Sequence, residues 1–207
     1  PFYVYETTKI TAFAVSNGKH NSSSSSVTYT LLNGDASDFT VDETDTLIGY
    51  NGSAVSVSVP SFINGNRVAK VAQSAFGGNA NVSSITFEES LATIGESAFV
   101  GCSNLTSVTA PGVTEIEDDA FKECENLAFV TSYELKNIGE RAFYGCPLLT
   151  RVTNDKLESI GANAFENTVK FTSVSSSYLK EIGNEAFKNS GLTSLGIGSV
   201  TDIGDYA

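Results

Sequence analysis

Three cysteines are the residues of this chain best suited to nucleophilic, redox or metal-binding chemistry. They stand at Cys102, Cys124 and Cys146, 22 residues apart. Equal spacing indicates that they fill one position of a repeat. Other copies of that position hold Asn79, Thr168 and Ser190. We therefore predict a buried row of small, weakly polar side chains with free thiols; a disulfide and a metal site are the alternatives, although in-register parallel side chains rarely point correctly for a disulfide.

A single histidine and a run of carboxylates are the other candidates for catalysis. His20 lies close to Gly18 and five consecutive serines, a stretch typical of a mobile loop, so a Ser-His-Asp or Cys-His arrangement would need fixing partners that the pattern does not show. Residues 88–125 hold nine acidic residues against one basic residue, with the densest group at Glu115, Glu117, Asp118, Asp119, Glu123 and Glu125. Paired carboxylates can transfer protons, but the spacing lacks a calcium-loop pattern. We predict a solvated acidic face, with adventitious calcium binding as the alternative, and neither catalytic residues, a metal centre nor a cofactor.

The composition excludes several classes of partner. The 207 residues include 24 acidic and 12 basic ones, and a net charge of -12 repels nucleic-acid phosphates and anionic lipid headgroups. No apolar run approaches the roughly 18 residues of a membrane-spanning helix, so membrane insertion is not expected. Abundant Ser, Thr and Asn, with no Trp, favour an extracellular β-rich module. Since the chain lacks methionine and begins without a signal-peptide pattern, we expect a processed chain or a piece of a longer one.

A six-residue block recurs along most of the chain and indicates an internal repeat. The block reads Ile-Gly-x-x-Ala-Phe, with variants, and its first residues follow one another at intervals of 21 to 23 residues. Those first residues are Val71, Ile94, Ile116, Ile138, Ile160, Ile182 and Ile203. Such regularity predicts a solenoid in which each repeat forms one coil that stacks on the coil before it.

The residues between the blocks predict the course of one coil. Three-residue apolar steps, cut by Gly, Pro or polar residues, argue against a continuous amphipathic helix. We expect residues 105–109 to form a parallel strand, residues 113–116 a second short extended segment and residues 96–101 a helical turn. The glycine after each isoleucine is expected to allow a turn with positive φ, and the alanine before each phenylalanine to leave room for the adjacent coil.

One phenylalanine falls at the same position in six coils, and we call this set the phenylalanine column. Its members are Phe76, Phe99, Phe121, Phe143, Phe165 and Phe187. Stacked coils place these rings one above another, and each buried ring removes roughly 150–250 Å² from water, worth about 4–6 kcal/mol as an upper bound. We expect this column to be the main source of stability.

The order Cys-x-x-Leu-x-x-Val, then Val-x-x-Ile-Gly-x-x-Ala-Phe, resembles the BspA-like branch of bacterial leucine-rich repeats. Residues 102–116 match this pattern closely, and the resemblance covers about residues 47–207. Glu117 in place of glycine, and Thr168 and Ser190 in place of cysteine, depart from it. The resemblance implies a leucine-rich-repeat solenoid with short parallel β-strands, helical turns and about 22 residues per coil. Residues 46–76 are similar to the entry coil of such proteins, which seals the end of the core.

The first 45 residues lack the repeat and are expected to form a small β-rich module or cap. Residues 11–15 and 27–32 alternate like half-buried strands, and residues 39–41 begin a third. The predicted organisation is therefore a β-rich segment over residues 1–45 and a BspA-like leucine-rich repeat domain over residues 46–207, whose last coil is truncated.

The strand face of the solenoid is the main candidate for a binding surface. Its expected outward positions are Ser84, Thr86, Ser107, Thr109, Phe129, Thr131, Arg151, Thr153, Ser173 and Ser175. Among these hydroxyl side chains, Phe129 beside Arg151 is the type of pair enriched in protein–protein hot spots. The candidate ligand-binding residues are Phe129, Arg151, Thr109, Thr131 and Thr153, and a merely solvated sheet face is the alternative. Tyr133, Tyr144 and Tyr178 either extend this surface or cover the core.

The resemblance also implies a class of function. Members of the family are typically secreted or surface-anchored microbial proteins, and some act as adhesins. We therefore expect a non-enzymatic, extracellular or cell-surface module, monomeric, that binds an extracellular protein or glycan through the repeat face. The alternative is a structural spacer within a longer surface protein, because Ala207 stops the last block before its phenylalanine. An enzyme would require hidden chemistry in the first 45 residues.

Overall fold

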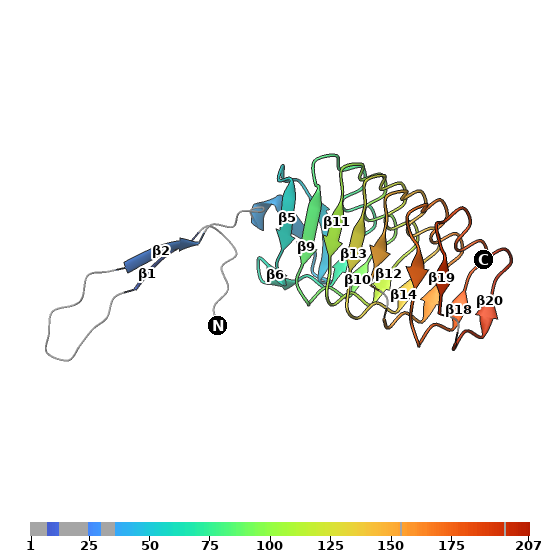
Figure 1. Cartoon of the computed structure of the whole chain (residues 1–207). Helices are drawn as coiled ribbons and strands as arrows, with labels where there is room; N and C mark the ends of the chain where they lie inside the picture. The colour runs from blue at the N-terminus through green and yellow to red at the C-terminus, as the bar shows by residue number, and fades with distance from the viewer. Residues whose placement is uncertain (1–7, 13–24, 30–35, 154, 197) are drawn as a thin grey trace, which may run out of the picture.

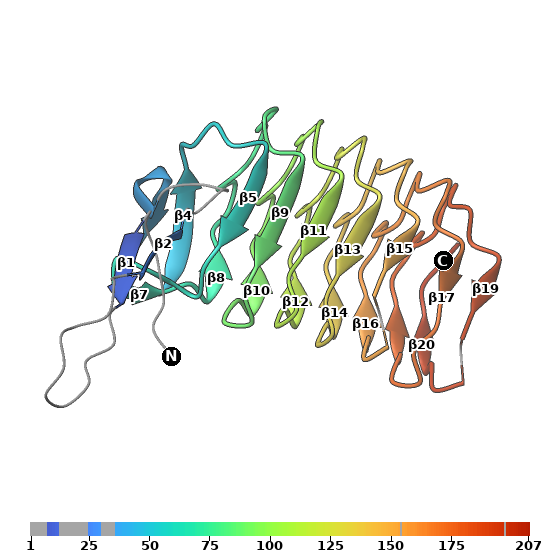
Figure 2. The same cartoon turned by 60° about the vertical axis from the view of Figure 1, so that its left-hand side comes forward.

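The protein is a solenoid whose coils lie side by side from β5 to β20 (Figures 1 and 2). The computed structural model describes residues 8–12, 25–29, 36–153, 155–196 and 198–207. A nine-stranded sheet runs along one side of the coils. Its strands, in spatial order, are β20 (Asp202–Ile203), β18 (Glu181–Ile182), β16 (Ser159–Ile160), β14 (Asn137–Ile138), β12 (Glu115–Ile116), β10 (Thr93–Ile94), β8 (Lys70–Val71), β4 (Thr46–Tyr50) and β3 (Phe39–Val41).

A five-stranded parallel sheet forms a second side of the coils. Its strands are β15 (Arg151–Val152), β13 (Phe129–Thr131), β11 (Ser107–Thr109), β9 (Ser84–Phe87) and β5 (Ser56–Val59). Between β11, β13 and β15 each residue pairs with the residue 22 positions further on, as in Val108 with Val130. The predicted parallel strands, the second extended segments and the 22-residue coil are thereby confirmed.

The first coil is closed by local structure. β3 pairs antiparallel with β4 and so covers the end of the nine-stranded sheet. Next to it, β6 (Phe62–Ile63) and β7 (Asn66–Arg67) form a hairpin whose turn residues Asn64 and Gly65 have φ of 52° and 88°. Asn and Gly are the residues that such a turn favours, because both central positions need positive φ. A short 3-10 helix, η1 (Ala36–Asp38), precedes β3.

The amino-terminal segment contributes a separate two-stranded pair. β1 (Thr8–Ala12) and β2 (Ser25–Tyr29) pair antiparallel, and they begin three and two residues before the predicted strands. The third predicted strand is β3, which belongs to the solenoid's sheet. The predicted mobile loop and His20 lie largely outside the described residues, and the division of the chain after residue 45 stays a prediction.

The predicted helical turn is wrong. Within the described part of the chain η1 is the only helix, and no helix there has the length and apolarity to cross a membrane. The N–H groups of Ser97, Phe99 and Gly101 donate to carbonyl oxygens of the next coil at 2.8–2.9 Å, whereas those of the intervening residues donate within the turn. Because every second N–H leaves the turn, the continuous i to i−4 bonding of an α-helix cannot form.

The predicted role of the repeat glycines is also wrong. Gly95, Gly139, Gly161 and Gly183 do not have positive φ. A Cβ atom at Gly161 would instead lie 2.5 Å from the carbonyl carbon of Gly139, in the backbone of the preceding coil. The positive φ falls two residues later, as at Asn163 with 55°. At Gly161, glycine is therefore needed because the backbone of the preceding coil lies too close for a Cβ atom.

The phenylalanine column is confirmed. Ring centroids of successive members lie 4.8, 5.1, 5.4, 5.3 and 5.5 Å apart, and every member is buried. Tyr50 continues the stack at 5.4 Å from Phe76, and Phe39 lies 5.0 Å from Tyr50. The aromatic core thus extends through Tyr50 of β4 to Phe39 of β3.

Hydroxyl and amide side chains bind neighbouring coils to one another. Thr106 donates to the carbonyl of Ser83 at 2.7 Å, and Thr150 donates to that of Ala128 at 3.0 Å. Asn126 reaches the carbonyl of Ser103 at 2.7 Å. These bonds satisfy backbone oxygens at the coil edges, so part of the high Ser, Thr and Asn content is structural.

The five-stranded sheet ends at β15, although Ser173 and Ser175 in the next coil are exposed as predicted. β17 (Ser173–Val174) pairs with β19 (Ser194–Leu195) and not with β15, so Ser173 and Ser175 do not continue the five-stranded sheet. Phe171 stands where the preceding coil has Leu149, and its ring stacks on Phe165 at 4.3 Å. We attribute the break to this larger buried side chain beneath the strand.

Candidate functional site

The three cysteines form the buried row that their spacing predicted. All are free thiols, and the alternative of a disulfide is not realised. Each thiol donates to the carbonyl of a phenylalanine in the preceding coil at 3.0 Å, beginning with Cys102 and Phe76. Burial raises the pKa of Cys146 to about 12, so this thiol stays protonated at neutral pH. The row caps the turns, and Cys146 offers no nucleophile at neutral pH.

Thiol labelling should reflect this burial. We expect the native protein at pH 8 to react with iodoacetamide at Cys146 at least about 1,000-fold more slowly than the urea-unfolded chain, because a pKa near 12 leaves about one thiol in ten thousand ionised. Mass spectrometry over a time course measures the modified fraction. The unfolded chain, with all three cysteines labelled, is the control. Rapid labelling of the folded protein would contradict the buried row.

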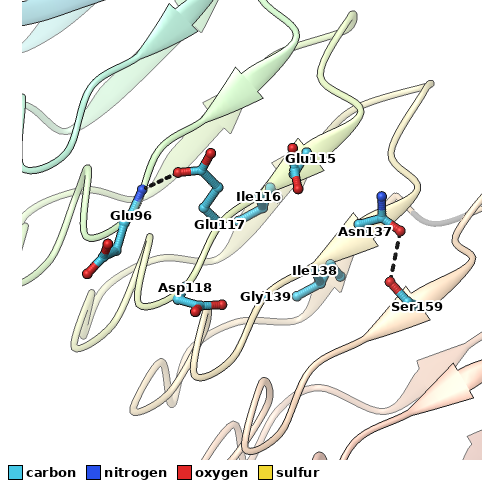
Figure 3. Close-up of a pocket in the computed structure, with 9 residues that line it drawn as sticks. All are labelled: Glu96, Glu115, Ile116, Glu117, Asp118, Asn137, Ile138, Gly139 and Ser159. Carbon is cyan, nitrogen blue, oxygen red and sulfur yellow. Dashed lines mark hydrogen bonds between the residues drawn. The ribbon is translucent and has the colours of Figure 1, made fainter.

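The acidic cluster lines a shallow groove on the side of the nine-stranded sheet. Figure 3 shows its lining residues, which enclose about 500 Å³: Glu96, Glu115, Ile116, Glu117, Asp118, Asn137, Ile138, Gly139 and Ser159. Glu117 accepts a bond from the Glu96 N–H at 2.9 Å and forms an ion pair with Lys70. Asp118 accepts one from the Glu140 N–H at 2.7 Å. These carboxylates therefore join neighbouring coils.

Asp119, next in this cluster, is held by Arg141 of the following coil. Two guanidinium nitrogens donate to its two oxygens at 2.9 and 3.0 Å. These bonds hold the pKa of Asp119 below its ordinary value, so the carboxylate is ionised and cannot act as a general acid near neutral pH. Among the described residues no group of three His, Cys, Asp or Glu side chains is placed to hold a metal ion.

The candidate binding residues lie together at the end of the five-stranded sheet. Phe129 pairs in register with Arg151, and Thr109 with Thr131, on adjacent parallel strands. Phe129 is 47% exposed and Arg151 is exposed, while the three threonines are half-buried. Thr153 follows β15, and its N–H donates to the carbonyl of Val130 at 3.1 Å. The structure thus brings all five residues to one face.

Tyr133 extends the same face. From Phe129 onward, residues are alternately exposed and buried, with Val130 and Ser132 buried, and Tyr133 is 62% exposed. The sequence left open whether Tyr133 extends this surface or covers the core; Pro111 and Asp155 hold its coil position in neighbouring repeats. The two-residue alternation continuing past the strand was the signal that pointed outward. We call Phe129, Tyr133 and Arg151 the aromatic–arginine patch.

Arg151 differs from most cations of the solenoid. Seven lysine and arginine residues form ion pairs with carboxylates: Lys70, Lys122, Lys136, Arg141, Lys156, Lys180 and Lys188. Within the described part of the chain Arg151 has neither an ion pair nor a side-chain hydrogen bond. Its guanidinium and the neighbouring ring of Phe129 are therefore both accessible to a ligand.

The comparison with family models identifies the repeat. Six copies of the BspA type leucine-rich repeat region match residues 47–168 and 110–207. The chain belongs to this family. Membership of this family accounts for the solenoid, its 22-residue coil and its buried phenylalanine column. No protein in the curated comparison set matches the chain.

Solved structures show the same fold as this BspA-type chain. A leucine-rich repeat protein of T. pallidum is 28% identical, with a TM-score of 0.74 over 83% of this chain and 86% of that one. A leucine-rich cell surface protein of Faecalibacterium prausnitzii is 21% identical, with a TM-score of 0.57 over 80% of this chain and 48% of that one. A leucine-rich repeat protein of Eubacterium ventriosum is 20% identical, with a TM-score of 0.58 over 75% of this chain and 50% of that one.

Proposed function

We propose that this protein is a non-enzymatic binding module, secreted or held at a microbial cell surface, that adheres to an extracellular protein or glycan through the five-stranded sheet. One observation carries the proposal: an exposed phenylalanine lies in register beside an exposed arginine that has no partner in the described part of the chain. Arginine is enriched among the residues whose alanine substitution disrupts protein–protein binding, and phenylalanine and arginine are both enriched at interfaces. A cell-surface location agrees with the description of the Faecalibacterium prausnitzii protein.

The threonines beside the patch support the same face. The hydroxyls of Thr109, Thr131 and Thr153 have no hydrogen-bond partner among the described residues, whereas Thr106 and Thr150 are bound to neighbouring coils. A row of free hydroxyls next to Phe129 supplies donors and acceptors at the edge of an apolar contact. This arrangement fits a binding surface with a small apolar centre and a polar rim.

Substitution of both Phe129 and Arg151 should weaken adhesion. We expect Phe129→Ala with Arg151→Ala to weaken binding to extracellular-matrix proteins or glycans by about 30-fold or more, since one hot-spot side chain contributes about 2 kcal/mol or more and two such contributions need not add. Panels of matrix proteins and glycans are probed with calcium and with chelator, and the dissociation constant is measured for every saturable hit.

A matched variant controls for general surface effects. Val169→Ala with Lys170→Ala also removes one exposed apolar side chain and one exposed cation without an ion pair in the described part of the chain, but in a turn outside the five-stranded sheet. This variant is expected to bind like the original protein. Unchanged binding of the Phe129/Arg151 variant would show that the site is wrong, and silence of both panels would favour a structural spacer, which the uninterrupted nine-stranded sheet also suits.

A further inference from the structure

Charge is distributed unequally between the two sheets. In the five-stranded sheet Arg151 is the only charged residue of any strand. The short strands of the nine-stranded sheet include the acidic residues Glu115, Glu181 and Asp202. A carboxylate that approaches the five-stranded sheet therefore meets a cation and no strand carboxylate, although the whole chain is strongly acidic.

The guanidinium of Arg151 suits a carboxylate partner. It presents five N–H donors in a planar fork that matches two carboxylate oxygens. Elsewhere in this protein the same geometry is seen between Arg141 and Asp119. Two acidic residues lie near Tyr133: Glu134, whose two oxygens Lys156 binds at 2.6 Å, and Asp155, which is exposed and holds the position of Tyr133 in the next coil.

The aromatic side chains define the shape of the complementary ligand. Strands in a sheet lie about 4.8 Å apart, so Phe129 borders Arg151 directly, whereas Tyr133 lies four residues along the coil, beyond the end of β13 and at most about 14 Å away. An extended segment of about four residues spans that length. It would place one apolar side chain against each ring, with the carboxylate beside the first.

A peptide fits this surface better than a sugar does. The outward positions of the five strands hold no Asn, Gln, Asp or Glu, the planar polar side chains that fix pairs of sugar hydroxyls. The patch offers two rings, one cation and hydroxyls, which together match apolar side chains next to a carboxylate.

We propose that the aromatic–arginine patch binds an extended protein segment that carries an aspartate or glutamate beside a large apolar side chain. This inference rests on the proposed function and names its partner class. Arg151 binds the carboxylate, and Phe129 and Tyr133 contact the apolar side chains.

The test uses an array of eight-residue peptides in matched sets. Each set places Asp or Glu, Asn or Gln, or Lys next to Phe, Leu or Tyr, and is probed with the fluorescently labelled full chain. We expect the acidic member to bind about tenfold or more tightly than its amide counterpart, because a charge-assisted bond is lost in the amide. Arg151→Gln should reduce that preference to within about twofold, and Arg151→Glu should transfer it to the lysine peptides.

Two control variants test the role of Arg151, and the contrary results separate failure of the carboxylate assignment from failure of the proposed function. Lys170→Gln removes a cation outside the patch and should keep the acidic preference, while Phe129→Ala should weaken acidic and amide peptides alike. Circular dichroism establishes that every variant is folded. Equal binding of acidic and amide peptides, or a preference that survives Arg151→Gln, overturns the carboxylate assignment but leaves the binding face intact. Binding confined to glycans also overturns it, whereas silence of peptides, proteins and glycans together overturns the proposed function itself.

Discussion

Phe143→Ala is expected to lower the free energy of unfolding by about 3–5 kcal/mol. The ring of Phe143 is fully buried between Phe121 at 5.4 Å and Phe165 at 5.3 Å, with interplanar angles of 4° and 15°. Alanine leaves a cavity that the neighbouring coils cannot close, because their spacing is set by the hydrogen bonds of both sheets. The loss therefore combines transfer of the ring to water with an unfilled volume.

Urea unfolding followed by circular dichroism measures this loss. Phe62→Ala is the matched control, since it removes the same side chain from a position that is 41% exposed, and it should change stability by less than about 1 kcal/mol. If both variants unfold at similar urea concentrations, the phenylalanine column is not the main source of stability.

Deletion of a whole coil provides a second comparison. Removing residues 139–160 joins Ile138 to Gly161, which have the same neighbours in the repeat as Ile138 and Gly139. The stack keeps its register and the number of coil interfaces falls by one, so we expect a smaller decrease in the thermal midpoint than Phe143→Ala produces. Equal decreases would argue against a core built from nearest-neighbour coils.

The repeat was predictable because one residue type at constant spacing carries both register and burial. Equal spacing of Phe99, Phe121 and Phe143 fixes which side chains stack, and the same 22-residue step pairs Phe129 with Arg151. Sequence reasoning therefore located the column and the candidate binding pair without coordinates.

Features set by contacts between coils were not predictable from one repeat. The turn at residues 96–101 has the length of a helical turn, but its form depends on carbonyl groups of the next coil. The end of the five-stranded sheet at β15 has no periodic signal in the sequence, and we attribute it to the larger side chain of Phe171.

Gly161→Ala is expected to lower the free energy of unfolding by about 1–3 kcal/mol, although it adds a single methyl group. The new Cβ would lie 2.5 Å from the carbonyl carbon of Gly139 and 2.6 Å from the nitrogen of Glu140. These are backbone atoms, so no side-chain rotation relieves the clash, and the two coils must separate. Separation lengthens the hydrogen bond from the Gly161 N–H to the carbonyl of Ile138, now 2.7 Å.

Gly49→Ala isolates this effect, because a Cβ at Gly49 meets nothing within 4 Å and its φ is not positive. Both substitutions reduce the freedom of the unfolded chain equally, so the difference between their urea midpoints reports the clash alone. Glu117 shows that this repeat position can carry a side chain, and there Lys70 and the Glu96 N–H bind its carboxylate. Alanine at Gly161 gains no such contacts. A midpoint equal to that of Gly49→Ala would mean that the coils separate freely, and that close approach does not explain the glycines.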